Sequence, residues 1–143
     1  MTGKEIEKRT NEIYYRVYKG GVRIGKYDLF TDEERQELKE LSARSMINSV
    51  LIYGYTHNRK EIWDNDSQKL VSVAEHILKH NRYVRDYAYN QAYHDFLGEA
   101  RMIRLIEEQV NDFAKAKVGF AGYDSEGVSY NYCLWGDEVN PIK

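Results

Sequence analysis

The sequence has little of several features that mark particular classes of protein. Cys133 is the only cysteine and Pro141 the only proline among the 143 residues, which excludes a disulfide framework and a zinc site built from cysteines. No apolar run approaches the roughly 20 residues that a transmembrane helix needs. The 21 basic residues nearly balance the 23 acidic ones, for a formal net charge of −2, which argues against binding of duplex nucleic acid. We therefore expect a cytoplasmic protein with no secretory signal and no membrane contact.

The length and the hydrophobic content fit a single domain over residues 1–143. Hydrophobic residues make up 42% of the chain, which is enough to form a core and argues against disorder. We expect residues 1–11 to form a short helix or a frayed end, and residues 136–143 to form a loose end. Tyrosine is abundant, with 13 copies, so tyrosine-rich segments are the first candidates for a binding surface.

Residues 12–30 have the pattern of a β-hairpin. Side chains alternate with period two on either side of Gly20-Gly21, a dipeptide that favours tight turns. The alternative is a helix over residues 3–19. That helix would place three apolar residues on one side, Ile6, Ile13 and Val17. We favour the hairpin because residues 13–18 are rich in β-branched and aromatic side chains.

A second hairpin is predicted over residues 118–135, with turn signals at residues 124–127. An isolated hairpin is only marginally stable in water. We therefore expect the two hairpins to pair into one four-stranded antiparallel sheet with helices on one face. The predicted fold class is α+β, with N- and C-terminal hairpins forming a small antiparallel sheet packed on about four helices.

The helical spacing of apolar residues predicts four helices, over residues 32–54, 67–80, 82–97 and 99–117. The first begins with a capping box that joins Thr31 to Glu34, and it ends at Gly54. Gly98 either separates the third helix from the fourth or lies inside one long helix, at a cost of roughly 1 kcal/mol. Residues 55–65 are predicted to form a polar loop.

No specific catalytic motif is present, neither a Gly-rich phosphate loop nor a Gly-x-Ser-x-Gly elbow. His76 and His80 are one helical turn apart, a spacing that can bind a metal ion, with His94 or Glu99 as candidates for a third ligand. We expect this pair instead to be boundary residues near a helix end, with no metal. We therefore predict that the protein is not an enzyme and has no cofactor.

The segment 82–94 combines Tyr, Asn, Arg and His at a spacing that suits a binding face. Tyr83, Tyr87, Asn90 and His94 follow one another at steps of four, three and four, so they share one face of a continuous helix. Such a face can stack a nucleobase and bind its edge, and each stacked base contributes about 1–3 kcal/mol. The alternative is that Tyr83 and Tyr87 are half-buried core residues whose hydroxyls reach the surface.

Glycine and arginine supply candidate groups for binding a phosphate. The Gly20-Gly21 turn lets backbone N–H groups approach an anion, and an arginine can bind phosphate through two hydrogen bonds. The alternative is an ordinary turn with surface cations. The predicted ligand-binding residues are Tyr83, Tyr87, Asn90, Tyr93, His94, Arg23, Arg82, Arg85, Arg104, Gly20 and Gly21.

Four features together resemble the phage Thoeris anti-defence proteins, which sequester nucleotide immune signals. They are the order of the predicted elements, the Gly20-Gly21 turn followed by Arg23, Arg104 in the last helix, and the Tyr- and Asn-rich segment 83–93. The resemblance implies a small, non-catalytic viral protein of the host cytoplasm that forms homodimers or larger oligomers. It also implies that a cyclic ADP-ribose isomer, or a cyclic oligonucleotide, is the bound small nucleotide.

Two other functions are compatible with the same sequence. Tyr and Arg dominate protein–protein hot spots, so the chain could instead be an anti-CRISPR-like inhibitor that binds a host defence protein. The third function is a metal-dependent phosphodiesterase that uses His76 and His80. Whichever of the three functions is correct, the wide apolar stripes of the helices at 32–54 and 99–117 predict a helical homodimer interface.

Overall fold

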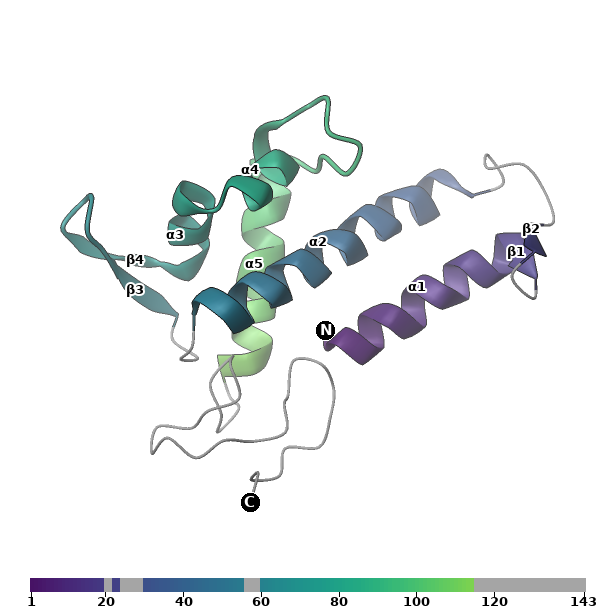
Figure 1. Cartoon of the computed structure of the whole chain (residues 1–143), viewed down its shortest axis with the longest axis horizontal. Helices are drawn as coiled ribbons and strands as arrows, with labels where there is room; N and C mark the ends of the chain where they lie inside the picture. Colours follow the sequence, from purple (N-terminus) through teal and green to yellow (C-terminus); the bar gives the residue numbers. More distant parts are fainter. Residues whose placement is uncertain (20–21, 24–29, 56–59, 115–143) are drawn as a thin grey trace, which may run out of the picture.

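The computed structural model describes residues 1–19, 22–23, 30–55 and 60–114. This part of the chain contains five helices, α1 (Gly3–Val17), α2 (Asp32–Gly54), α3 (Val73–His80), α4 (Arg82–Tyr89) and α5 (Glu99–Ala114). Figure 1 shows the long helix α2 at the centre, with α1 alongside it and α5 crossing behind it. Helices α3 and α4 pack against α5 and against each other. Within the described residues, no helix combines the length and the apolar character that crossing a membrane requires.

The strands form two separate antiparallel pairs, so the fold class is α+β as predicted. Strand β1 (Tyr18–Lys19) pairs with β2 (Val22–Arg23), and β3 (Glu61–Asp64) pairs with β4 (Lys69–Ser72). The two pairs do not join, and the predicted hairpin at 118–135 lies outside the described residues. The predicted arrangement of N- and C-terminal hairpins in one four-stranded sheet is therefore not confirmed.

The first part of the segment predicted as a hairpin, residues 12–17, is helical, so the alternative helix is correct up to Val17. Helix α1 begins with a capping box at Thr2 and continues to Val17. Side-chain burial explains the outcome: Val17 is 1% exposed and Tyr15 is 64% exposed, whereas strand alternation would place both on one face. The centre of the predicted hairpin is confirmed, because Tyr18 pairs with Arg23 and Lys19 with Val22 in two short antiparallel strands. The apolar contact of α1 with α2 therefore outweighs local β-propensity.

The predicted bounds of α2 are confirmed, and local signals explain them. The Thr31 hydroxyl accepts a hydrogen bond from the Glu34 amide at 3.1 Å, and the Glu34 carboxylate accepts one from the Thr31 amide at 2.8 Å. Gly54 is the last helical residue. The helix has apolar residues on two sides because it borders two cores, one shared with α1 and one shared with α3, α4 and α5.

A β-hairpin occupies the segment predicted as a polar loop and the first part of a helix. Strands β3 and β4 pair from Glu61 with Ser72 to Asp64 with Lys69. The Asp64 carboxylate accepts hydrogen bonds from the backbone and the hydroxyl of Ser67, which closes the turn. Helix α3 begins only after Ser72, whose hydroxyl caps it by accepting from the amide of Glu75.

Helix α4 ends at Tyr89 and does not continue to residue 97 as predicted. Asn90 has extended backbone angles, and its side-chain oxygen accepts from the Ala92 amide at 3.1 Å, a local turn that competes with helix continuation. The chain then returns to α4, where the amides of Leu97 and Gly98 both donate to the Tyr87 carbonyl. With φ of +98°, Gly98 separates α4 from α5.

The apolar stripe of α5 is covered within the chain itself. Met102 and Ile106 are 0% exposed and Val110 is 4% exposed. They pack with residues of α2, α3 and α4, including Ile47, Ile77 and Val84. These residues therefore do not supply the surplus apolar surface on which the predicted helical homodimer interface depended.

Candidate functional site

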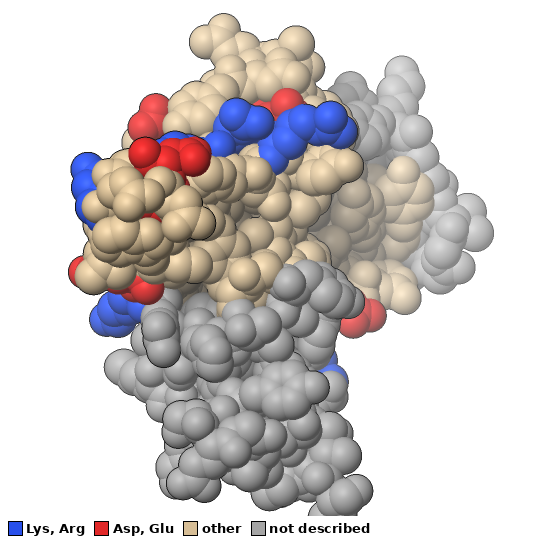
Figure 2. All heavy atoms as spheres, turned by 60° about the vertical axis from the view of Figure 1, so that its left-hand side comes forward, with Lys and Arg blue, Asp and Glu red and all other residues tan. Residues whose placement is uncertain are grey.

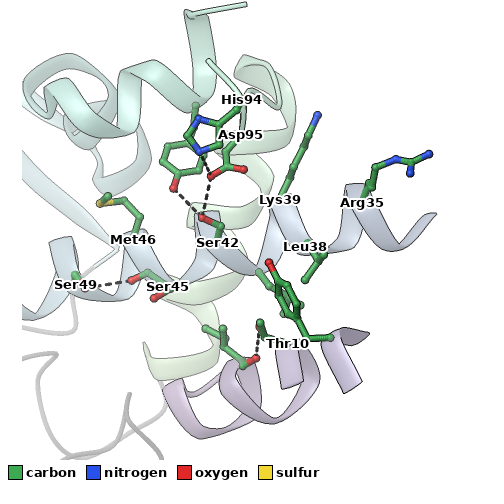
Figure 3. Close-up of a pocket in the computed structure, with 14 residues that line it drawn as sticks. Thr10, Arg35, Leu38, Lys39, Ser42, Ser45, Met46, Ser49, His94 and Asp95 are labelled. Carbon is green, nitrogen blue, oxygen red and sulfur yellow. Dashed lines mark hydrogen bonds and ion pairs between the residues drawn. The ribbon is translucent and has the colours of Figure 1, made fainter. Parts of the chain in front are cut away.

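A cleft of about 680 Å³ opens across α2, between α1 and the segment that follows α4. Figure 3 shows Thr10 of α1 on one side of α2, and His94 and Asp95 on the other. Ser42, Ser45 and Ser49 of α2 line the cleft between them. The volume lies within the range of about 300–1,000 Å³ that is usual for small-molecule sites.

Four polar side chains linked by short contacts line one wall of the cleft. The Tyr87 and Ser42 hydroxyls are 2.9 Å apart, and Ser42 donates to Oδ2 of Asp95 at 3.3 Å. His94 Nε2 lies 3.3 Å from the same oxygen. Burial raises the pKa of Tyr87 to about 12, so its hydroxyl stays protonated at neutral pH and acts as a neutral hydrogen-bonding group.

The opposite wall combines aromatic and apolar surface from α1 with Leu38 of α2. Tyr14 is 43% exposed, and its ring meets Phe30 edge to face with a centroid separation of 5.5 Å. The Thr10 hydroxyl donates to the Ile6 carbonyl at 2.7 Å, which leaves its oxygen able to accept a hydrogen bond. This wall therefore offers an accessible ring and a polar group.

Positive charge is concentrated at one end of the cleft. Arg35 and Lys39 line it, and Asp95 is the only carboxylate among the lining residues. Arg35 donates to the Phe30 carbonyl at 2.7 Å and pairs with Asp32. Lys39 has no ion-pair partner among the described residues, and Figure 3 shows it extending from the same helix as Ser42. Lys39 is thus the cation best placed to bind an anion in the cleft.

Two of the predicted ligand-binding residues, Tyr87 and His94, line this cleft. Tyr93 packs against Tyr87, with the two rings edge to face and 5.2 Å between centroids. The predicted shared face of Tyr83, Tyr87, Asn90 and His94 is wrong, because α4 ends before Asn90. Tyr83 is 58% exposed whereas Tyr87 is 4% exposed, and Asn90 caps the helix.

The predicted arginines do not gather around a common point. Arg104 donates to Glu40 at 2.7 Å and to Glu108 at 3.2 Å, so its charge is already paired. Arg82 and Arg85 are exposed on α4, and the Arg82 guanidinium lies 5.3 Å from the centre of the Tyr83 ring. The side chain of Arg23 lies outside the described part of the structure, as do Gly20 and Gly21.

The sequence contained a signal for the cleft that our prediction missed. Arg35, Lys39, Ser42, Ser45 and Ser49 follow one another on α2 at steps of four, three, three and four, which places them along one side of the helix. A stripe of cationic and small hydroxyl residues on a helix with apolar residues on its other sides indicates a polar cavity. The distant partners Thr10, Tyr14 and Asp95 could not be inferred from that stripe.

A second group of polar side chains joins the β3–β4 hairpin to α3. Donor atoms of Asp64, His76 and His80 all lie within 4.8 Å of one another. Asp64, rather than His94 or Glu99, is therefore the residue that accompanies the histidine pair. Hydrogen bonds to the Asp64 carboxylate lower its pKa well below the usual range. The Lys79 ammonium has the largest effect, and Ser67 and His80 contribute less.

Charge is mixed on the face that carries this hairpin. Figure 2 shows basic and acidic side chains side by side around a broad uncharged area, with no extended basic surface among the described residues in view. Comparison of the chain with protein-family models, with curated proteins and with solved structures found no match. The resemblance to the Thoeris anti-defence proteins therefore stays a prediction from the sequence.

Proposed function

We propose that the protein is a non-catalytic binding protein that sequesters a small phosphorylated nucleotide in the cleft across α2. The observation that carries the proposal is the composition of this 680 Å³ cleft. An accessible tyrosine ring, several hydroxyl groups and a lysine with no ion-pair partner in the described part of the chain surround a space of ligand size. These are the groups that a base, a ribose and a phosphate need, respectively.

Each part of the ligand has a corresponding group in the cleft. The partly exposed Tyr14 ring can stack on a base. Ser45, Ser49 and Thr10 offer hydroxyls to the ribose. Lys39 supplies the charge for a phosphate, since hydrogen bonds to charged groups are the strong ones.

The order of the polar groups argues against hydrolysis. Ser42 and His94 both contact Asp95, at 3.3 Å each, so the carboxylate lies between the hydroxyl and the imidazole. A nucleophilic triad needs the imidazole between the hydroxyl and the carboxylate, because the imidazole must take the hydroxyl proton. This arrangement supports binding and release of an unchanged ligand. By the sequence resemblance, a cyclic ADP-ribose isomer or a cyclic oligonucleotide is the first ligand to test.

Isothermal titration calorimetry with cyclic ADP-ribose isomers, ADP-ribose and cyclic dinucleotides tests the proposal. We expect one member of this panel to bind, and we expect Lys39→Gln to weaken its binding at least about tenfold, since a hydrogen bond to a charged group contributes about 1.5–3 kcal/mol. Lys69→Gln removes the same charge from strand β4, outside the cleft, and should leave the affinity unchanged. Ser45→Trp should fill the cleft and abolish binding.

Folded protein that gives no heat with any of these ligands would rule out the proposal. Equal effects of Lys39→Gln and Lys69→Gln would show that binding depends on net charge and not on the cleft. Chromatography of the ligand recovered after binding should return it unchanged, and a hydrolysed product would contradict the non-catalytic assignment.

One observation favours the second candidate, an inhibitor that binds a host defence protein. Trp63 and Leu70 face each other across the β3–β4 hairpin and are 50% and 61% exposed. Tryptophan is enriched among the hot spots of protein interfaces, and adjacent exposed apolar side chains often mark an interaction site. A pull-down from host lysate that yields one stoichiometric protein, lost in the Trp63→Ser variant, would favour this function over nucleotide sequestration.

A further inference from the structure

The last turn of α3 presents two histidines to the neighbouring hairpin. Ser72 caps the helix, and the buried residues Ala74, Ile77 and Leu78 turn one side of it into the core. His76 and His80 are then left on the flank of the helix, one turn apart, with 4.4 Å between their ring centroids. Two imidazoles at this spacing can bind the same metal ion.

The hairpin supplies a carboxylate to the same place. Asp64, the last residue of β3, is 1% exposed, and its Oδ1 lies 2.9 Å from His80 Nε2. Its other oxygen, Oδ2, accepts from the Ser67 hydroxyl and from the Lys79 ammonium, both at 2.6 Å. Hydrogen bonds therefore orient one carboxylate oxygen, as is common for metal-binding carboxylates. The other oxygen contacts His80 Nε2, so a metal ion would enter between these two atoms.

The second imidazole is oriented in a similar way. Nδ1 of His76 lies 2.6 Å from the Tyr55 hydroxyl, so Nε2 is the nitrogen that remains for a metal ion. The Tyr55 and His76 rings also meet edge to face, with centroids 5.6 Å apart. Hydrogen bonds to the second nitrogen commonly fix the tautomer and the direction of metal-binding histidines.

We propose that Asp64, His76 and His80 form a binding site for a divalent transition-metal ion, zinc being the ion that this donor set fits best. The donor atoms lie within 4.8 Å of one another. Ligands at about 2.0–2.2 Å from a tetrahedral zinc ion lie roughly 3.3–3.6 Å apart, so side-chain rotations that move the donor atoms by about 1 Å close the site. Three protein ligands leave one position for water or an external group, and the ion would tie the hairpin to α3.

Lys79 is the feature that separates this proposal from a purely structural role for the cluster. Its ammonium competes with a metal ion for Asp64, and its side chain is 40% exposed, so it can move into solvent. If the cluster binds zinc, Lys79→Gln removes a repulsive charge and should raise the zinc affinity. If the cluster is only an ion pair that holds the hairpin, Lys79→Gln weakens the hairpin and creates no affinity for zinc.

The proposal is tested on untagged full-length chain stripped of metal with a chelator. Calorimetry should show one zinc ion bound per chain and no heat with magnesium. Cobalt(II), used in place of zinc, should give the visible absorption of an ion bound by nitrogen and oxygen. Replacing a ligand, in His76→Ala or His80→Ala, should weaken binding by more than the roughly 10- to 100-fold that loss of an outer partner costs.

His94→Ala is the matched control, because it removes another imidazole that lies beside an aspartate, 3.3 Å away, in a different part of the molecule. It should leave the zinc affinity unchanged. Circular dichroism of each variant checks that it is folded, and His80→Gln provides a milder replacement if His80→Ala unfolds. Zinc binding that is absent, or equal in wild type and both ligand variants, would overturn the proposal. Because the cleft residues play no part in this site, the result is independent of nucleotide binding.

Discussion

Two glycines at helix ends should respond in opposite directions to the same substitution. Gly98 has φ of +98°, and a Cβ placed there would meet only the Phe96 ring edge, at 3.9 Å. The cost of Gly98→Ala is therefore backbone strain, about 1–3 kcal/mol, reduced by the 0.4–1 kcal/mol that alanine gains by restricting the unfolded chain. A net loss of about 1–2 kcal/mol in the free energy of unfolding is expected.

Gly54 is the matched control. It is exposed and ends α2 with helical geometry, and nothing lies within 4 Å of a Cβ placed on it. Gly54→Ala should therefore stabilise the protein by about 0.5–1 kcal/mol. Urea unfolding of both variants measures the difference directly, and thermal unfolding should move by roughly 3–5 °C for each kcal/mol. A Gly98→Ala variant as stable as wild type would refute the reasoning, since it would mean that residue 98 can adopt an ordinary helical conformation.

Two further predictions concern hydrogen-bonded pairs. Arg16, with the Thr31 amide, lowers the pKa of Glu34 from 4.5 to about 2. Glu34 therefore contributes stability above pH 4.5 that is lost as the pH falls through 2. Urea unfolding across this pH range should show wild type and Arg16→Gln converging at low pH, and a constant difference would contradict the pairing. Tyr87→Phe removes the hydroxyl 2.9 Å from Ser42 and should cost about 1 kcal/mol. Ser42→Ala in the same background should then cost less than it does alone, and additive losses would show that the two hydroxyls do not interact.

Local signals predicted the elements whose determinants lie within a few residues of each other. The capping box at Thr31 and the glycine at residue 54 set both ends of α2. The break at Asn81 ends α3 and caps α4, since its side chain accepts from the Val84 amide at 2.9 Å. Of the two alternatives left open for Gly98, the boundary before α5 is the correct one. These boundaries follow from backbone hydrogen bonds that a sequence can encode locally.

The errors fall where tertiary contacts decide between two local patterns. Residues 12–17 have high β-propensity, yet Ile13 and Val17 are buried at helical spacing against α2. Leu70 fits the apolar stripe of a predicted helix but is 61% exposed on a strand. The carboxylate of Asp64 and the positive φ of 55° at Gln68 form the turn that prevents that helix. None of these determinants appears in the periodicity of apolar residues.

Both candidate sites depend on the same helix, and each takes some of its remaining residues from segments that local rules assigned wrongly. The middle of α2 supplies Ser42 to the cleft, and Tyr55, which caps the end of α2, contacts His76. The other residues of the cleft come from α1, which supplies Thr10 and Tyr14, and from the segment after α4, which supplies Asp95. The histidine pair is completed by Asp64 of the β3–β4 hairpin. A polar side chain that packing buries costs stability unless hydrogen bonds compensate it, as they do for Asp64 and Tyr87. Long-range packing therefore supplies the polar groups that complete both clusters, and for that reason neither cluster could be predicted as a whole from local patterns.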